Sequence, residues 1–474
     1  MTMKGFSRRA FMQRVAALAG GLAAVSVIGS GCAPKATPAP AAPTTAPKSD
    51  TAPTAAPVKT EEKITLRVQV EGGPLGVQMG ELCAKWNEQN PNIQAVVEEV
   101  VYAEIAMKTE MGFATGDLQD SLFAFTRWHW LGAYKGWYLA IDDLLDAGVV
   151  PDYDDYYEIG VENQKFEGKT YGLIDSVHGG PAMVITWNRG LIEEAGQQPP
   201  TPDMDIWDLH ELALKCTNPD KGIFGIQMVA HTPGRLANSV RAWGKPEYGA
   251  NGDTSSWLVS PDGKSYNFVD NVGAKAFFQD WLRPLLDARA HPKREDDVQE
   301  GLFVAGKVAL YQGHQGHPLR FMKSVGDKWD YHTQDAILLP VGPEGRRGTS
   351  WECHNRCVYA KTKYPEETLR LNAFVTSYEA GIKSLEMTGN RSGRKSVLRD
   401  PKWKEQFPVY GALDELLTSG IVEPYPMPWN LRDVEASDVH KNTMDPLIQG
   451  TATWDEQAPI VQAEMQKILD QERP

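Results

Sequence analysis

The sequence has few cysteines, no excess of positive charge and no long hydrophobic run beyond its N-terminus. Only 5 of its 474 residues are Cys, which excludes a small disulfide-stabilised scaffold. Its formal net charge of -14 would repel a phosphate backbone and argues against nucleic acid as a partner. No later segment reaches the roughly 18 consecutive apolar residues of a membrane-spanning helix. With 42% hydrophobic residues, the chain is expected to fold as a soluble protein with two large lobes.

The N-terminus has the features of an export signal. An Arg pair precedes a short apolar run over residues 15–28, and this run is too short to span a bilayer. The Arg pair resembles the twin-arginine export signal, and the Gly-Ser-Gly-Cys sequence that ends at Cys32 resembles a lipoprotein cleavage box. Gly29 stands where such a box usually has a large aliphatic residue. We therefore expect residues 1–31 to be a signal peptide, with a short buried N-terminal helix as the alternative, and Cys32 to be lipidated.

Residues 32–62 have the composition of an extended linker. They are mostly Pro, Ala and Thr, with little to bury. Such a segment cannot offset the entropy of folding and adopts extended, partly polyproline II conformations. A lipid anchor followed by this linker would hold a globular body at the outer face of the cytoplasmic membrane or in the periplasm.

The globular body begins with a strand–helix–strand pattern. Residues 64–70 alternate between apolar and polar and predict a strand, residues 76–90 have helical spacing, and residues 93–101 predict a second strand. Residues 121–125 predict a further, buried strand. Strands that alternate with helices indicate an α/β fold with mostly parallel sheets covered on both faces. A ligand then binds at the carboxyl ends of the strands.

Several short stretches resemble, in order, the signature segments of the family 1 extracellular solute-binding proteins, the maltose-binding type. They are residues 86–91, 116–117, 168–173, 187–189, 191–196, 207–212, 303–309, 340–343, 377–379 and 388–391. Each stretch alone is weak, but their order and spacing over residues 64–474 combine into a strong signal. The resemblance implies the type II periplasmic-binding-protein fold, in which two α/β lobes joined by a three-crossing hinge close on a solute. It also implies delivery of that solute to the permease subunits of an ABC transporter.

The same resemblance places the lobe boundaries. It implies a first lobe of residues 63–174 plus 341–398 and a second lobe of residues 178–335 plus 399–474. The chain would cross between the lobes near residue 175, in a short, polar, glycine-containing segment whose backbone angles can absorb closure.

Five residues follow predicted strands at the edge where this fold binds its ligand. Arg127, Trp128, His129 and Trp130 come directly after the buried strand, and Glu71 follows the first strand. The two Trp rings can stack on the apolar face of a sugar, while Arg and His donate hydrogen bonds to hydroxyl groups. Packing of one Trp beneath the loop is the alternative.

Further candidates fall in predicted hinge or cleft loops. They are Asp175, His178, His231, Gln312, His314, Gln315, Trp351, Glu352, Arg391 and Trp429. The resemblance implies ligand contacts for Gln312, His314 and Gln315, and it places Arg391 in a segment that borders the cleft. Plain packing is the alternative for both Trp residues. The spacing of His314 and His317 allows zinc, but no third ligand has metal spacing, so we expect no metal and no cofactor.

Two pairs of alternatives concern the cysteines and the ligand. Cys353 and Cys357 are close in sequence and could form a disulfide in an oxidising compartment if their Cα separation permits.

A mono- or oligosaccharide is the favoured ligand of a monomeric binding protein. A polyamine or peptide is the alternative, and Arg127 and Arg391 count against a cation. A glycosidase would need two carboxylates roughly 5–10 Å apart, which Glu71, Asp175 and Glu352 could supply, but the motif order favours a binder over an enzyme.

Overall fold

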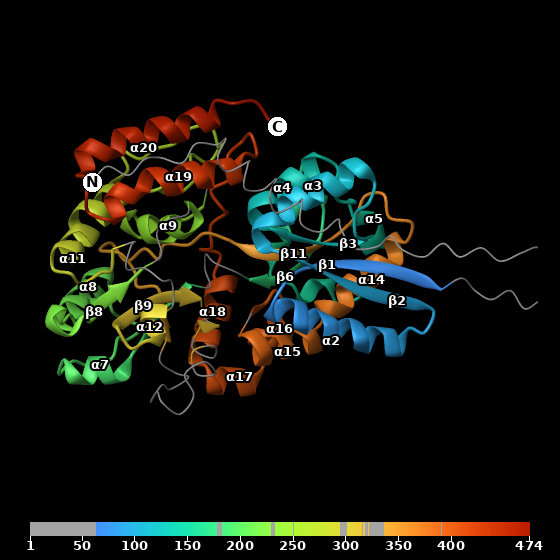
Figure 1. The fold of residues 1–474 in the computed structure, drawn as a ribbon, viewed down its shortest axis with the longest axis horizontal. Coiled ribbons are helices and arrows are strands. Elements are labelled where there is room, and N and C mark those ends of the chain that lie inside the picture. Colours follow the sequence, from blue (N-terminus) through green and yellow to red (C-terminus); the bar gives the residue numbers. More distant parts are fainter. Residues whose placement is uncertain are drawn as a thin grey trace, which may run out of the picture. The chain divides into compact units, whose positions relative to one another are not determined.

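The protein contains two β-sheets with helices packed around each of them (Figure 1). The computed structural model describes residues 63–177, 183–228, 233–249, 251–293, 301–314, 316–317, 321, 336–389 and 391–474. The expected signal peptide, Cys32 and the linker lie outside these residues, as do His178, His231 and Gln315. Within the described ranges, no helix combines the length and apolar character that crossing a membrane requires.

The first sheet has six strands in the order β12-β6-β11-β3-β1-β2. Its strands are β1 (Ile64–Glu71), β2 (Ile93–Val100), β3 (Ser121–Phe125), β6 (Leu173–Val177), β11 (Cys353–Val358) and β12 (Arg391–Ser392). β1 pairs in parallel with β2 and β3, and α2 (Pro74–Gln89) connects β1 to β2, which confirms the predicted strand–helix–strand unit. Met79, Leu82 and Trp86 of α2 are buried, as their helical spacing predicts.

The second sheet has four strands in the order β10-β7-β9-β8. They are β7 (Met183–Trp187), β8 (Phe224–Gln227), β9 (Val308–His314) and β10 (Ala336–Leu338). β8 and β9 are parallel, whereas β7 runs antiparallel to both β9 and β10. The α/β fold class is confirmed, but both sheets are mixed instead of mostly parallel, because strands that return after a crossing, such as β10 and β11, run against their neighbours. A short ribbon of β4 (Lys165–Phe166) and β5 (Lys169–Thr170) stands apart from the two sheets.

The helices fall into groups along the chain. Those before β7 are η1 (Tyr102–Glu104), α3 (Ile105–Thr115), α4 (Thr126–Tyr134), α5 (Asp142–Asp146), η2 (Tyr153–Asp155) and α6 (Glu158–Asn163). Those between β7 and β10 are α7 (Arg189–Glu194), α8 (Ile206–Lys215), η4 (Pro219–Lys221), α9 (Pro233–Val240), η5 (Arg241–Trp243), α10 (Val272–Lys275), η6 (Ala276–Leu282), α11 (Arg283–Asp287) and α12 (Gly301–Val304). After β11 come α14 (Pro365–Val375), α15 (Tyr378–Thr388), α16 (Lys395–Leu398), α17 (Pro401–Gln406), α18 (Pro408–Thr418), α19 (Asp433–Ile448) and α20 (Trp454–Leu469).

The chain passes between the sheets more than once. It leaves the first sheet after β6, enters the second at β7, and returns from β10 to β11. Helices α19 and α20 then bury Met444 and Val461 in the core of the second sheet. We call the part built on the first sheet lobe one and the part built on the second sheet lobe two.

The expectation that all of residues 399–474 pack on lobe two is wrong for α17 and α18. Trp403 and Leu413 lie in a core that also contains Leu173, Trp351 and Val184, so this core joins strands of both sheets. The physical reason is that these helices lie next to the crossing strands, where they bury apolar surface against both lobes. In Figure 1, α18 lies between the two groups of strands.

The disulfide between Cys353 and Cys357 does not form. Both cysteines are free and buried, and they stand four positions apart on the single strand β11. At roughly 3.3 Å per residue a strand separates such positions by about 13 Å, beyond the roughly 7 Å that a disulfide can bridge.

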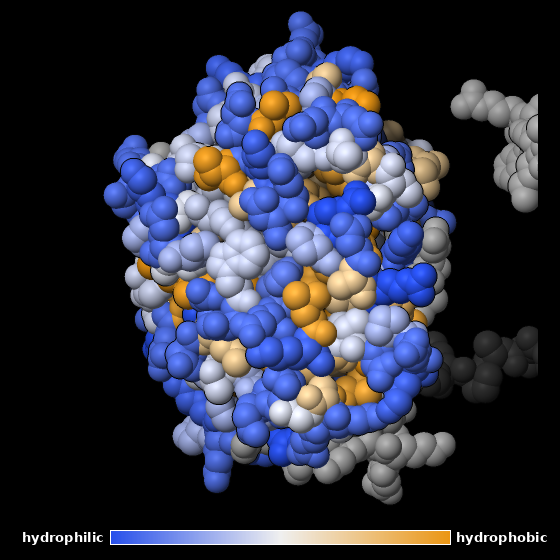
Figure 2. Space-filling model, turned by 90° about the vertical axis from the view of Figure 1, so that its left-hand side faces the viewer, coloured by the Kyte–Doolittle hydropathy of each residue, from blue (hydrophilic) through white to orange (hydrophobic). Residues whose placement is uncertain are grey.

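The face of the molecule in Figure 2 is mostly hydrophilic, and its apolar side chains lie in small separate groups. Single exposed apolar residues of this kind are normal for a protein surface.

Candidate ligand-binding site

The ends of β1 and β3 face lobe two, and an ion pair joins the two lobes there. Helix α4 directly follows β3 and packs against α19 (Figure 1). Arg127 in the first turn of α4 donates a hydrogen bond through Nε to Oδ2 of Asp433, the first residue of α19, at 3.0 Å. The side chains of Arg127 and Asp433 are 18% and 1% exposed, so this contact between the lobes is shielded from water.

A second contact completes the surroundings of Asp433. The hydroxyl of Tyr425 donates to both carboxylate oxygens of Asp433, at 3.3 and 3.2 Å. Burial raises the pKa of Asp433, while Arg127 and Tyr425 act in the opposite direction. The carboxylate of Asp433 is therefore held by two donors, one from each lobe.

Aromatic rings of lobe one lie beside this ion pair. Trp128 is buried, and its ring packs edge-on against Phe125 and at a tilt against Tyr102, with 5.7 Å between centroids in both cases. Its buried Nε1 donates no hydrogen bond to any described residue. An indole N–H normally has a partner when it is buried. Within the described part of the chain, the donor of Trp128 is thus unused, as are those of Trp86, Trp187 and Trp257 elsewhere in the fold, and a bound molecule that reaches it would supply an acceptor.

Glu352 lies immediately before β11 and reaches across to lobe two. A Cβ atom built on Gly234, in the first turn of α9, would lie 2.0 Å from Oε1 of Glu352 and 2.6 Å from Cε2 of Tyr425. A larger side chain at this position would displace the Glu352 carboxylate or the Tyr425 ring, because non-bonded heavy atoms do not approach so closely. Glycine at this position therefore allows α9 to come next to the Glu352 carboxylate.

The carboxylate of Glu352 is buried without a hydrogen bond or ion pair to any described residue, and the side chain is 4% exposed. Burial raises its pKa to about 7, a shift that Arg235 and Arg127 oppose and Asp433 increases. Burial also raises the pKa of Glu71, at the end of β1. A buried carboxyl group with a strongly raised pKa in a cleft is typical of a functional site.

These residues form one group, which we call the interlobe cluster. It comprises Glu71, Tyr102, Arg127, Trp128 and Glu352 from lobe one, and Gly234, Arg235, Tyr425 and Asp433 from lobe two. Burial raises the pKa of the Tyr102 phenol to about 12. This phenol also experiences the charges of four neighbours, namely Arg127, Glu352, Glu71 and Arg235. The cluster therefore combines aromatic rings, carboxylates and guanidinium groups in one partly shielded region, in which Tyr102 remains exposed, and both lobes contribute to it.

Four residues predicted from the sequence to contact ligand are brought together in this cluster, namely Glu71, Arg127, Trp128 and Glu352. Tyr102, Arg235, Tyr425 and Asp433 also lie in the cluster but are not predicted from the sequence. Tyr102 could have been found, because it follows β2 at the carboxyl end of a parallel strand. The other three come from lobe two, and no motif in the sequence indicates that they meet lobe one.

Two predicted ligand residues are buried outside the interlobe cluster. His129 is buried, stacks on Tyr138, and has Nε2 3.3 Å from the carbonyl oxygen of Gln164. Burial lowers its pKa to about 4, so the ring is neutral. Trp351 is completely buried and donates through Nε1 to Sγ of Cys353 at 3.2 Å. The structure corrects the assignment of both side chains to the ligand, because their polar atoms are used within the core.

Three other predicted residues have partners of their own. Trp130 donates through Nε1 to the carbonyl oxygen of Asn163 at 3.0 Å, and Trp429 donates to that of Leu469 at 2.7 Å. Asp175 in β6 accepts a hydrogen bond from Nε of Arg356 at 3.1 Å. These contacts hold the segments next to the cluster and leave the three side chains outside it.

The predicted residues of β9 and β12 lie on other elements than those of the cluster. Gln312 is buried within β9, opposite Ile185 of β7. His314 ends β9, and its backbone N–H donates to Nδ1 of His317 at 2.9 Å. Arg391 begins β12, where its backbone pairs with Val177. In the described parts of the chain, no group of three or more His, Cys, Asp or Glu side chains could hold a metal ion.

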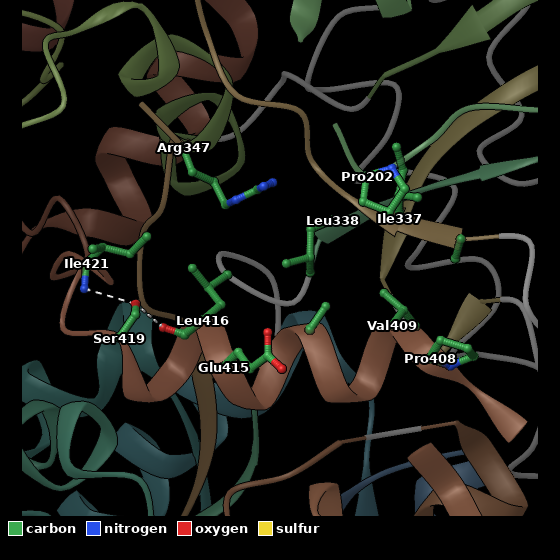
Figure 3. Close-up of a pocket in the computed structure, with 12 residues that line it drawn as sticks. Pro202, Ile337, Leu338, Arg347, Pro408, Val409, Glu415, Leu416, Ser419 and Ile421 are labelled. Carbon is green, nitrogen blue, oxygen red and sulfur yellow. Dashed lines mark hydrogen bonds between the residues drawn. The ribbon is translucent and has the colours of Figure 1, made fainter. Parts of the chain in front are cut away.

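A separate cavity of about 400 Å³ lies between β10 and α18 (Figure 3). Its lining residues are Pro202, Ala336, Ile337, Leu338, Arg347, Pro408, Val409, Ala412, Glu415, Leu416, Ser419 and Ile421. Figure 3 shows Arg347 and Glu415 on two sides of a largely apolar space. None of these lining residues is aromatic, so this cavity lacks the flat rings on which sugars stack. The interlobe cluster is the better candidate for carbohydrate.

The sequence matches the bacterial extracellular solute-binding protein family over residues 81–408, which is more than half of the chain. The protein therefore belongs to this family, whose members bind solutes. A comparison with curated proteins finds no match.

Solved structures share the two-lobed fold. The ABC substrate-binding protein Lmo0181 from Listeria monocytogenes, in complex with cycloalternan, has a TM-score of 0.70 and 16% identity over 86% of this chain and 99% of that chain. The sugar-binding protein MalE from Xanthomonas citri has a TM-score of 0.69 and 16% identity over 85% and 97%. The GacH receptor of Streptomyces glaucescens, solved without ligand and with acarbose, has a TM-score of 0.68 and 18% identity over 86% and 99%.

Proposed function

We propose that this protein captures a carbohydrate between its two lobes and delivers it to the permease subunits of an ABC transporter. The observation that carries the proposal is the interlobe cluster. Its aromatic rings, carboxylates and guanidinium groups come from both lobes and lie together at the boundary between them. The three similar structures named above support it, since their names describe ABC or sugar-binding proteins or complexes with cycloalternan and acarbose.

The chemistry of the cluster suits a polyol. The ring of Tyr102 is 37% exposed and offers flat apolar surface against which a pyranose can pack, and the buried ring of Trp128 supports it. The carboxylates of Glu71 and Glu352 can accept hydrogen bonds from sugar hydroxyls, and the indole N–H of Trp128 can donate one. A sugar bound here would satisfy polar groups that are buried without partners, which favours the bound state.

Closure of the lobes would couple binding to transport. Arg127 of lobe one pairs with Asp433 of lobe two, and Glu352 approaches Gly234 across the same boundary. A ligand that contacts both lobes binds the closed state more tightly, and this difference in affinity shifts the population towards closure. Permease subunits that dock the closed form would then collect loaded protein in preference to empty protein.

The N-terminal segment would anchor the protein at the membrane. We expect the anchored protein to be a monomer. We propose cleavage of residues 1–31, lipidation of Cys32 and a flexible linker over residues 32–62. Cys32→Ser is expected to move the protein from the membrane pellet to the soluble fraction, whereas Lys at both Arg8 and Arg9 is expected to stop twin-arginine export. A Ser variant that stays in the pellet contradicts the lipid anchor.

The function is tested by thermal-shift screening of the purified protein against mono- and oligosaccharides, with polyamines and short peptides in the same panel. A ligand that binds only the folded state raises the apparent stability by RT ln(1 + [L]/Kd). We expect stabilisation by at least one carbohydrate and none by the polyamines or peptides. Stabilisation by polyamines or peptides alone would favour the alternative ligand class for the same fold.

A glycosidase is the second candidate, because the cluster contains a buried carboxyl group, Glu352, whose pKa of about 7 suits a general acid. Incubating the protein with each oligosaccharide that stabilises it, and assaying for newly formed reducing ends, distinguishes the two functions. We expect no release of sugar. Release that is lost in Glu352→Gln would establish the enzyme.

A further inference from the structure

When its carboxyl groups are ionised, the interlobe cluster carries more negative than positive charge. It contains three carboxylates, Glu71, Glu352 and Asp433, and two guanidinium groups, Arg127 and Arg235. Asp433 compensates the positive charge of Arg127, because the two side chains form an ion pair at 3.0 Å. The presence of Arg127 therefore does not argue against a cationic ligand, as it does when the sequence is considered alone.

The remaining charges leave one carboxylate without compensation. Arg235 acts on Glu352 through its charge, but no hydrogen bond or ion pair joins the two among the described residues. Glu71 acts on the same Tyr102 phenol and has no cation of its own within these residues. A buried charge is stable only when it is paired and hydrogen-bonded. The cluster therefore lacks one positive charge and the donors that would satisfy Glu352.

We propose that the solute is a carbohydrate that carries a protonated amine, and that Glu352 receives this ammonium group. The inference rests on the proposed function, because it refines the ligand class of the same site. An ammonium group supplies three donors and one positive charge, which matches the unpaired oxygens of Glu352 and the net charge of the cluster.

The neighbouring rings favour the same ligand. Tyr102 and Trp128 lie side by side with 5.7 Å between ring centroids. The negative charge of Glu352 raises the pKa of Tyr102. A cation that lies over an aromatic face within about 6 Å is attracted by the ring electrons. A sugar that packs on the exposed part of the Tyr102 ring can place its ammonium group between this ring and Glu352. A neutral sugar would leave the net negative charge of the cluster uncompensated.

Titration calorimetry with matched sugars tests the proposal on the unmodified protein. The probes are glucosamine, N-acetylglucosamine and glucose, together with the three corresponding β-1,4-linked disaccharides. Within each set the amine is present, blocked or replaced by hydroxyl, while the ring stays the same. We expect at least one amino sugar to bind 10-fold or more tightly than both of its neutral counterparts.

Glu352→Gln provides the second arm of the experiment. It keeps the size and hydrogen-bonding capacity of the side chain but removes its charge. Binding of the preferred amino sugar should weaken at least 10-fold, while binding of its neutral counterpart should change less than 3-fold. Asp175→Asn is the matched control, because Asp175 pairs with Arg356 outside the cluster, and it should leave the preference for the amine unchanged.

The outcomes separate this inference from the proposed function. If neutral sugars bind as tightly as their amino counterparts, or if Glu352→Gln weakens both classes equally, the amine assignment is wrong and carbohydrate binding stands. If other carbohydrates stabilise the protein but no amino sugar binds, the assignment is likewise wrong. If no carbohydrate of any kind binds, the proposed function fails together with the inference.

Discussion

Two buried glutamates of this protein lie in very different surroundings. Glu423 accepts a hydrogen bond from Nη2 of Arg346 at 2.7 Å and one from the backbone N–H of Gly249 at 3.2 Å, and Arg241 lies 3.6 Å away. Glu352, in the interlobe cluster, has no such partner among the described residues. Both side chains are less than 5% exposed, so the difference between them is in pairing and not in burial.

The network around Glu423 stabilises a part of the fold that follows β10. Nη1 of Arg346 donates to the carbonyl oxygens of Lys245, Glu247 and Asp253, each at 2.8 Å. Arg346 thereby fixes Lys245, Glu247 and Asp253 to the segment that returns towards lobe one. This network supplies hydrogen-bond and ion-pair partners for the Glu423 carboxylate from inside the chain. The carboxylate that lacks them, Glu352, is the one for which we propose a ligand.

The largest effect is expected from breaking the paired glutamate. Glu423→Ala leaves two buried guanidinium groups, those of Arg241 and Arg346, without their counter-ion. Removal of one partner from a buried ion pair costs about 3–5 kcal/mol of unfolding free energy. Urea unfolding followed by circular dichroism measures this loss. A loss below about 1 kcal/mol would contradict the view that this network stabilises the fold.

A smaller effect is expected at the ion pair between the lobes. Asp433→Asn removes the charge that holds Arg127 while keeping an acceptor for Tyr425. A hydrogen bond between charged groups contributes about 1.5–3 kcal/mol, and we expect a loss in this range. Because the pair joins both lobes, small-angle scattering of the ligand-free variant should also show a larger radius of gyration. An unchanged radius together with unchanged stability would mean that the pair does not hold the lobes together.

Replacing the unpaired glutamate, Glu352, should raise the stability of the fold instead of lowering it, and the size of this gain depends on pH. The pKa of Glu352 is raised from its ordinary value of 4.5 to about 7 in the folded state. Between these values the folded protein holds a proton that the unfolded chain has lost. Stability therefore falls as pH rises through this window, by at most about 1.4 kcal/mol per pH unit. Glu352→Gln removes this loss and should be more stable than the unmodified protein at pH 8.

The difference between the two proteins isolates Glu352 from other titrating groups. His129, whose pKa is lowered to about 4, acts with the opposite sign, because stability falls as pH falls below its ordinary value of 6.5. This contribution is present in both proteins and cancels. Thermal or urea unfolding at pH 5 and pH 8 is sufficient. A Gln variant that is less stable at pH 8 would show that the carboxylate has a partner in the free protein.

The smallest effect is expected from removing the unused donor of Trp128. Trp128→Phe keeps an aromatic ring against Phe125 and Tyr102 but removes the indole N–H. Ligand binding should weaken by about 0.5–1.5 kcal/mol, the contribution of one hydrogen bond. Titration calorimetry with a sugar from the thermal screen measures it. Trp128→Ala is less informative, because removal of this buried ring also costs about 3–5 kcal/mol of stability. Unchanged affinity in the Phe variant would exclude this donor from the site.

The residues of lobe one in the candidate site were predictable from local sequence patterns. The period-two alternation of residues 64–70 predicts β1, and the topology of parallel strands places Glu71, Arg127 and Trp128 at one edge of the sheet. The periodicity of the sequence does not indicate which side of α4 faces the interlobe cluster. The sequence therefore predicts ligand contacts for both His129 and Trp128, although only Trp128 lies in the cluster.

Local sequence patterns predicted the α/β architecture, because alternating strand and helix patterns depend on neighbouring residues. The sequence also pointed to the family, through the order of short segments along the chain. Two features could not be predicted from local patterns: Asp433 and Tyr425 meet at Arg127, and α18 packs between the two lobes. Arg127 and Asp433 are 306 residues apart, and such a contact follows from how two lobes pack against each other. The same packing left Glu352 buried without a partner, because an unsatisfied charge arises from all elements around it and not from its neighbours in the chain.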